Sequence, residues 1–417
     1  MAEPTLTELT VSRTPPRTDA SRVLLGLGNT VDLELRWDSE VVAGLVREHR
    51  LDEVDAAPEV VTTEADLVRS LLDHLESGDG GEHYVASVDA LAAFAAHFEA
   101  RPTLGGTNVR AALAMRPLGR TSTVHLVSTG PVTHDLLPDD LRTISSARGD
   151  TLDPHVIVQF PAGASVAVGD RTIVTPRANR VIYVNDRPNA ELVVADEFGE
   201  VAARADVVLV SGLNSIQDVD LLDARLADLR RHLARRRPGA VAVYEHGAFH
   251  VAGCGDLVRR RLGPRVDVWS CNEEELQEHL HRRIDLLDPQ AVLDAVRDLH
   301  ASVGAETLVV HTQRWALALG GAEPLRRAMV VGGLTLAGAR YRYGDAVTAA
   351  HLADVPGWPS QPDAQAFAEA VEAAAGSDVT CRAAYAVAVT VPTTIGLGDA
   401  FVGGVVAALA DRADVPG

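Results

Sequence analysis

Short runs of β-branched and aliphatic residues alternate along the chain with longer stretches whose apolar residues recur every three or four positions. The short runs are typical of buried strands, and the spacing in the longer stretches is typical of amphipathic helices. We predict strands at 23–26, 124–128, 156–160, 207–211, 240–244, 267–270 and 307–311. We predict helices at 65–76, 88–99, 221–235, 291–302 and 364–375. This alternation indicates an α/β fold with a largely parallel sheet.

The order of elements is less regular between residues 31 and 103 and again between residues 162 and 194. The second stretch contains strand-like runs at 171–174, 180–184 and 191–195. We interpret the two stretches as an insertion that forms a lid. The domain boundaries that we predict are 33–103 and 161–195 for the lid, and 21–32, 104–160 and 196–417 for a large α/β domain. Residues 1–20 are polar and contain prolines, which predicts a disordered segment.

Composition excludes several classes of function. The 417 residues carry 58 acidic and 38 basic side chains, a formal charge of −20, and every one of the 38 is an arginine. The absence of lysine rules out the lysine-bearing phosphate loop, the protein-kinase lysine and a Schiff base. The negative charge argues against binding to nucleic acid. Because no apolar stretch reaches the roughly 20 residues that a membrane helix needs, we predict a cytoplasmic protein without membrane contact. The three cysteines form no CxxC pair, which favours reduced thiols over a zinc site.

The most informative motif lies near the C-terminus. Gly396, Leu397, Gly398 and Asp399 follow Thr393 and Thr394 after an apolar run, and an apolar helical stretch comes next. The pattern predicts a turn that leads into a helix, where backbone amides can approach a phosphate. Asp399 would then be placed to accept a proton from an attacking hydroxyl. A simple turn with Asp399 as a helix cap explains the same residues.

A second group of polar residues follows a predicted strand. Asn272 and Glu275 have nearly the spacing of a capping box, so initiation of a helix accounts for the pair. The alternative is that Glu275, with Asn272, holds the water shell of Mg²⁺ close to a strand's carboxyl end. Glu245 is a candidate second carboxylate, or an exposed acid at the end of a strand. His246 and His250 lack the glutamate of a zinc HExxH motif.

Two glycine-containing segments have side chains that suit a sugar. The first contains Asn29 and Asp32 after a predicted strand, and the second contains Gly105, Gly106 and Asn108 before a helix. Carboxylate and amide groups can pair with neighbouring hydroxyls, and glycines permit close approach of the backbone. Each segment alone is equally consistent with a turn or a cap.

Together these motifs resemble the ADP-dependent glucokinase and phosphofructokinase family, a branch of the ribokinase-like kinases, from about residue 23 to the end of the chain. Residues 272–276 resemble the NxxE metal motif, residues 396–399 the GxGD catalytic motif and residues 105–108 the GG-x-N sugar segment. Residues 176–182, with Arg177, Asn179 and Arg180, are similar to the arginine-containing lid strand. His311 and Thr312 are similar to the HT segment beside the nucleotide.

The resemblance implies a doubly wound, mostly parallel sheet with a smaller β-rich lid. It also implies that Asp399 is the general base for phosphoryl transfer from ADP to a sugar hydroxyl, with AMP as the leaving group and Mg²⁺ as the cofactor. Amides around Gly396, Leu397 and Gly398 would form the anion hole, and Thr393 and Thr394 would lie beside the nucleotide. The expected ligands are ADP or AMP and a hexose or hexose phosphate, and no obligate protein partner is evident. One departure concerns the HxE motif of the family, where Val243 replaces the histidine while Glu245 is kept.

The acceptor is less sharply defined. Glu82 follows two glycines, as in the glucose-using members of the family, and a carboxylate at this place would repel a sugar phosphate. Arg177, Arg180 and Arg187 could instead form an anion site. We therefore expect a glucose kinase, with a 6-phosphofructokinase as the alternative. An ATP-dependent sugar or nucleoside kinase of the wider group and a non-catalytic binding protein are further alternatives.

Overall fold

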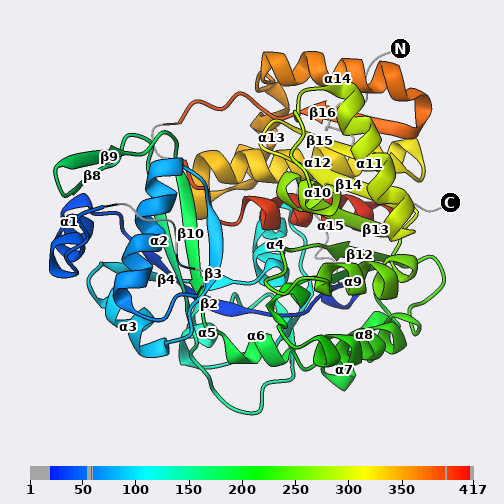
Figure 1. Ribbon diagram of the computed structural model, residues 1–417. Helices are drawn as coiled ribbons and strands as arrows, with labels where there is room; N and C mark the ends of the chain where they lie inside the picture. Colours follow the sequence, from blue (N-terminus) through cyan, green and yellow to red (C-terminus); the bar gives the residue numbers. More distant parts are fainter. Residues whose placement is uncertain (1–18, 54–57, 59, 390–391, 414–417) are drawn as a thin grey trace.

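The computed structural model describes residues 19–53, 58, 60–389 and 392–413, so most of the segment predicted to be disordered lies outside the described residues. A nine-stranded sheet forms the centre of the larger part of the molecule (Figure 1). Its order is β16-β15-β14-β13-β12-β11-β1-β5-β6. The bounds of these strands are β1 (Val23–Leu25), β5 (Thr123–Leu126), β6 (Arg142–Ser145), β11 (Val207–Val210), β12 (Val241–Glu245), β13 (Val268–Asn272), β14 (Thr307–His311), β15 (Trp315–Gly320) and β16 (Val379–Ala383).

The strands from β6 to β14 in this order pair in parallel, and β15 and β16 add an antiparallel edge. The prediction of a largely parallel α/β sheet is therefore confirmed. Such a sheet buries both faces under helices. In β1, for example, Leu24 and Leu25 belong to the cores on opposite faces.

One face is covered by α4 (Thr107–Met115), α12 (Glu323–Tyr343) and α15 (Leu397–Ala413). The other is covered by α7 (Asp196–Ala202), α8 (Val219–Leu233), α9 (Cys254–Leu262), α10 (Glu273–Leu280), α11 (Pro289–Val303) and α14 (Pro362–Ala375). Side-chain caps explain where several of these helices begin, since Asp218 caps α8 and Asp288 caps α11. The shorter helices α5 (Pro131–Leu136), α6 (Arg187–Glu191) and α13 (Ala349–Asp354) lie in connecting segments.

A five-stranded sheet forms the lid, in the order β3-β10-β7-β2-β4. Its strands are β2 (Thr30–Leu35), β3 (Gly81–Tyr84), β4 (Ala100–Gly105), β7 (His155–Phe160) and β10 (Asn179–Val184). Helices α1 (Ser39–Glu48), α2 (Glu64–Ser77) and α3 (Val88–Ala96) pack on one face, and the hairpin of β8 (Ser165–Val168) and β9 (Arg171–Val174) extends the lid at the left of Figure 1.

Two expectations about this region are wrong. Strand β7, which the sequence grouped with the large domain, lies between β10 and β2 in the lid sheet, and β2 begins at Thr30. A β-branched run predicts a buried strand but carries no information on which sheet receives it. The strand expected at 191–195 is also absent, because Glu191 ends α6 and the following residues lie outside regular structure.

Candidate active site

One face of the lid sheet is polar. In β2 the polar residues Thr30, Asp32 and Glu34 alternate with apolar residues, of which Leu35 packs into the lid core. Cross-strand partners point to the same side of a sheet. Arg180 is the partner of Gln159, and Asp32 is the partner of both His155 and Thr103. The register therefore places polar side chains from all five strands on this face: Glu82, Arg180, Gln159, His155, Asp32, Glu34, Thr103 and Arg101.

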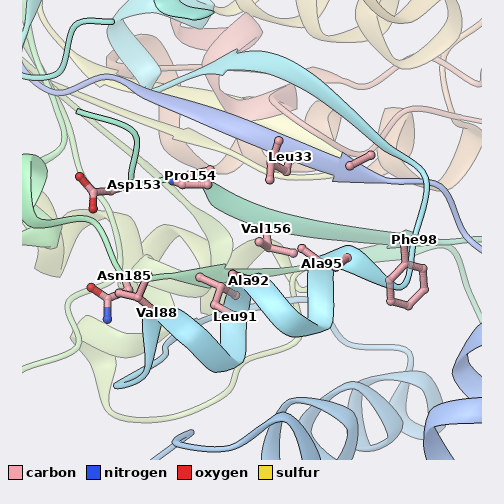
Figure 2. Close-up of a pocket in the computed structure, with 12 residues that line it drawn as sticks. Leu33, Val88, Leu91, Ala92, Ala95, Phe98, Asp153, Pro154, Val156 and Asn185 are labelled. Atoms are coloured by element: carbon pink, nitrogen blue, oxygen red, sulfur yellow. The ribbon is translucent and has the colours of Figure 1, made fainter. Parts of the chain in front are cut away.

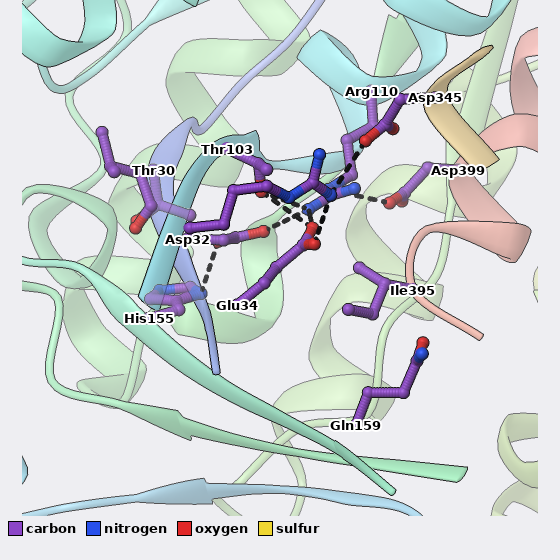
Figure 3. Close-up of polar contacts among 12 residues, drawn as sticks. Thr30, Asp32, Glu34, Thr103, Arg110, His155, Gln159, Asp345, Ile395 and Asp399 are labelled. Atoms are coloured by element: carbon purple, nitrogen blue, oxygen red, sulfur yellow. Dashed lines mark hydrogen bonds and ion pairs between the residues drawn. The ribbon is translucent and has the colours of Figure 1, made fainter. Parts of the chain in front are cut away.

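The polar face lies against segments of the large domain. Gln159 Oε1 accepts hydrogen bonds from the amide of Thr394 at 2.9 Å and from its hydroxyl at 3.0 Å. Glu82 lies 3.3 Å from His250, in the segment after β12. Ion pairs from this face to the large domain are drawn in Figure 3, which also shows Asp399 and Gln159 on opposite sides of Ile395. The candidate active site is this interface.

The catalytic turn predicted at 393–399 leads directly into α15, which confirms the predicted turn and helix. Gly396 has a φ of +68°, and a Cβ there would approach nitrogen atoms of Arg110 and Arg340 at 3.1 Å. Only glycine combines this backbone conformation with such close neighbours. Asp399 lies in the first turn of α15 with 21 % of its side chain exposed. The positive end of a 17-residue helix therefore faces the interface.

Two carboxylates lie at the ends of neighbouring strands β12 and β13. Asn272 and Glu275 form the capping box of α10, in which Asn272 Oδ1 accepts hydrogen bonds from the amides of Glu274 and Glu275. Glu275 is buried, and burial together with the charge of Glu245 raises the pKa of its carboxyl well above the ordinary value. Glu245 Oε2 is buried without a hydrogen-bond partner among the described residues.

This donor set suits Mg²⁺. A hard cation would relieve the repulsion between the two buried carboxylates and would give Glu245 Oε2 a partner. Asn272 uses its amide oxygen to cap α10, so the carboxylates are the better candidates.

His311, at the end of β14, connects this group to the catalytic turn. Its Nε2 lies 3.0 Å from Glu245 Oε1, and its ring stacks on Phe401 of α15 with 4.6 Å between the ring centres. Burial alone would lower the pKa of His311, but the hydrogen bond to Glu245 and the surrounding carboxylates raise it. Thr312 accepts hydrogen bonds from the amides of Arg314 and Trp315, so its hydroxyl shapes the β14–β15 hairpin.

The predicted sugar-binding residues are placed differently from one another. Asp32 is buried at the interface, where one carboxylate oxygen bonds Arg110 at 2.6 Å and the other has no hydrogen-bond partner among the described residues. Gly105 and Gly106 lie beside it, at the start of α4. Asn108 is buried and donates to the carbonyl of His125, which leaves its Oδ1 without a described partner.

Asn29, which was predicted to bind sugar, makes structural contacts with the backbone. Its side chain is 1 % exposed and bonds the backbone of Val127 and Ser128 through both amide atoms. It therefore ties the start of the lid to β5.

The side chains of the arginine-containing segment 176–182 also differ in whether they lie on the polar face of the lid. Arg177 is 57 % exposed and bonds Gly78 and Asp79 on the lid itself, and Asn179 also donates to the carbonyl of Gly78. Arg180 lies on the polar face near Glu82, and its buried Nε has no hydrogen-bond partner among the described residues. Of the two arginines predicted to bind sugar, only Arg180 is on this face.

Several polar residues of the interface were missed by the sequence analysis: Glu34, Arg110, His155, Gln159, Arg340 and Asp345. The alternation of polar residues in β2 could have revealed Glu34. The others come together only through the pairing of strands and through contacts between the lid and the large domain.

A separate cavity of about 370 Å³ lies on the opposite face of the lid sheet, between α3 and strands β2 and β7 (Figure 2). Leu33 and Val156 line it with small apolar residues of α3. It is thus separated from the polar face by the sheet.

The comparison with known families shows to which family the chain belongs. The model of the ADP-specific phosphofructokinase/glucokinase conserved region matches residues 21–326. The chain belongs to this family. It is 28 % identical over 181 residues to the ADP-dependent glucose/glucosamine kinase of Pyrococcus abyssi, a match that covers 40 % of this chain and 38 % of that relative.

Solved structures show the same fold. A hypothetical ADP-dependent phosphofructokinase from Pyrococcus horikoshii aligns with a TM-score of 0.73 and 17 % identity, over 94 % of this chain and 98 % of that one. An ADP-dependent kinase in complex with fructose 6-phosphate and ADPβS aligns with a TM-score of 0.75 and 14 % identity, over 94 % of each chain. The implied fold, a mostly parallel α/β sheet with a smaller β-rich lid, is therefore confirmed.

The structure shows what surrounds Val243, the residue that replaces the histidine of the HxE motif. Val243 is fully buried in the apolar core beneath α15, with β11 and β13 on either side. The histidine that pairs with Glu245 is instead His311, at the end of β14, which lies two strands away from β12 in the sheet. In the described part of the chain, no helix is long and apolar enough to cross a bilayer.

Proposed function

We propose that the protein transfers the terminal phosphoryl group of ADP to a hydroxyl group of a hexose, with AMP and a hexose phosphate as products. The observation that carries this proposal is the position of Asp399, at the start of α15, facing the polar side of the lid. The same interface contains a buried acceptor for a hydroxyl group, Asp32 Oδ1. Family membership supports the use of ADP.

In the proposed reaction Asp399 accepts the proton of the attacking hydroxyl. The sugar oxygen forms a bond to the β-phosphorus of ADP while the bond from that phosphorus to the bridging oxygen breaks, and AMP leaves. Amides at Gly396, Leu397 and Gly398 and the dipole of α15 stabilise the transferring group. Glu245 and Glu275 would hold Mg²⁺, which neutralises charge on the phosphates when bound. Catalysis then comes mainly from positioning and charge stabilisation.

Glucose is the acceptor that we favour. Glu82, Asp32 and Glu34 give the polar face of the lid three carboxylates, which suit the hydroxyls of a neutral sugar and repel a phosphate. The alternative, fructose 6-phosphate, is supported by Arg180, whose buried Nε has no partner among the described residues.

The test is a product analysis with the purified protein and Mg²⁺. ADP, ATP or pyrophosphate is offered with glucose, glucosamine, fructose 6-phosphate and a panel of other hexoses, and the nucleotide products are identified. AMP formed with glucose but not with fructose 6-phosphate supports both parts of the proposal. Formation of AMP only with fructose 6-phosphate supports the alternative acceptor. Production of ADP from ATP, or binding of sugar and nucleotide without turnover, contradicts the proposed function.

A further inference from the structure

Arg110 is a buried cation between the lid and the catalytic turn. It comes from α4, its side chain is 7 % exposed, and three carboxylates surround its guanidinium group. Nη2 lies 2.6 Å from Asp32 and 3.5 Å from Glu34, both on the lid, and Nε lies 3.9 Å from Asp399. The same guanidinium thus faces the candidate sugar-binding carboxylate and the candidate base.

Charges of alternating sign continue from Arg110 around the catalytic turn. Glu34 also pairs with Arg101 at 2.6 Å, and Arg101 pairs across the interface with Asp345 at 3.0 Å. Asp345 pairs with Arg340 at 2.8 Å. Arg340 donates at 2.7 Å to the carbonyl of Ile395, the residue before Gly396. The network therefore begins beside Asp399 and ends at the backbone of the same turn.

Electrostatics explains why a cation is needed at this place. Arg110 contacts Asp32 and Glu34 of the lid as well as Asp399, and unpaired like charges in a partly buried interface repel one another strongly. A guanidinium group is permanently charged and has donors on several sides, so it can pair with more than one carboxylate. Gly396 leaves the space that the guanidinium occupies.

We propose that Arg110 is a positioning residue, which holds the sugar-binding carboxylate of Asp32 and the base Asp399 at their working separation when the lid is closed. The inference rests on the proposed function. Arg110 acts through these two carboxylates, so its loss misplaces the attacking hydroxyl relative to the base. A misplacement on the order of 1 Å costs roughly 100-fold in rate.

The first experiment compares Arg110→Met and Arg110→Lys with Arg326→Met. Arg326 is a matched control because it is 3 % exposed and bonds backbone carbonyls and Thr380 in the large domain. We expect kcat per folded molecule to fall by roughly 100-fold in Arg110→Met, with the KM for ADP changed less than about threefold. Arg110→Lys should recover only part of the loss, because an ammonium group lacks the fork of donors. Arg326→Met should lower the melting temperature and leave kcat of the folded fraction unchanged.

A second experiment separates charge from packing. In Arg110→Ala, added guanidinium at millimolar concentration should restore part of kcat in a saturable way, whereas urea, which is neutral and of similar shape, should not. Equal effects of the two molecules would show that Arg110 only fills space and would overturn the proposal. So would a kcat for folded Arg110→Met within about threefold of the parent value.

Failure of the underlying function is recognised separately. If the unmodified protein forms no AMP from ADP with any hexose or hexose phosphate, the proposed function fails before any variant is compared. If the unmodified protein turns over and the Arg110 variants match it, only the role of Arg110 is wrong.

Discussion

Asp399 combines partial exposure with a position at the start of a long helix, beside Arg110. These features suit a base that must meet a substrate hydroxyl. Asp399→Asn keeps the shape of the side chain and removes its ability to accept a proton. We expect kcat to fall by about two to four powers of ten, with the dissociation constant for the sugar nearly unchanged. Steady-state kinetics and calorimetry measure the two quantities.

The control for this variant is Asp294→Asn, at an exposed position on α11. It makes the same chemical change far from the interface, so kcat should stay at the parent value. Parent-level turnover in Asp399→Asn would remove Asp399 from the mechanism.

Protonation of His155 should make the stability of the protein depend on pH. Burial would lower its pKa, but the hydrogen bond to Asp186 and the charges of Asp32 and Glu82 raise it above the ordinary 6.5. The protonated form is therefore favoured in the folded state. The stabilisation is complete below the unfolded pKa and is lost as the pH rises through the folded value. We expect the difference in melting temperature between the parent and His155→Gln to shrink from about pH 6 to about pH 9.

His246 provides the contrasting case. Burial lowers its pKa to about 3, so it stays neutral across the same range. The unfolded chain still binds a proton at His246 near pH 6, so the parent gains stability as the pH rises through about 6.5, and the destabilisation of His246→Gln should grow from about pH 6 to about pH 7.5 and then level off. This trend is opposite to the one expected for His155→Gln, and a falling trend in both variants would point to a general effect of pH on the protein.

Hydrophobic periodicity and capping motifs predict those features of helices and strands that depend on residues close together in the sequence. The helix-turn at 393–399 and the cap of α10 depend on neighbours in sequence, and both were predicted. The assignment of β7 failed because the same apolar run suits either sheet, and only the register with Asp32 and Arg180 decides. The contacts of Asn29 could not be predicted, because its partners, Val127 and Ser128, lie about a hundred residues away.

The capping residue of α10, Asn272, should affect both the stability of the protein and the placement of Glu275, a candidate metal ligand. Asn272→Ala removes the hydrogen bonds that Asn272 Oδ1 accepts from the first turn and the bond from Nδ2 to Oε1 of Glu275, while the backbone amide still donates to Oε2. The carboxylate of Glu275 is then held by one bond instead of two. We expect a loss of about 1 kcal/mol in the free energy of unfolding. If Glu275 helps to hold Mg²⁺, the concentration of Mg²⁺ for half-maximal activity should also rise.

Asp288→Ala is the matched control, since Asp288 caps α11 with the same kind of bonds away from the carboxylates. It should lose a similar amount of stability, measured by denaturant unfolding, without any change in the requirement for Mg²⁺. Equal Mg²⁺ titrations for the two variants would limit Asn272 to its role as a cap.

For the whole molecule, function depends on the meeting of two sheets that the sequence describes separately. The polar face of the lid depends on the large domain, because its carboxylates and arginines find several of their partners on α4, on Asp345 in the turn after α12, and in the segment after β12. This explains why single motifs predicted the catalytic turn while Gln159, Arg110 and Asp345 were missed. Their partners are set by closure of the lid.

Gln159 offers the most direct test of that coupling, because it joins the lid sheet to the catalytic turn by two hydrogen bonds to Thr394. Gln159→Leu has similar volume and accepts neither bond, while the partly buried amide of Thr394 loses its partner. Each lost bond costs about 1 kcal/mol, so closure should weaken by roughly tenfold or more, and kcat/KM for the sugar should fall by the same factor. Gln365→Leu, at an exposed position on α14, should leave kcat/KM unchanged. If Gln159→Leu also keeps the parent kcat/KM, the lid closes without this contact, and the catalytic turn does not depend on it.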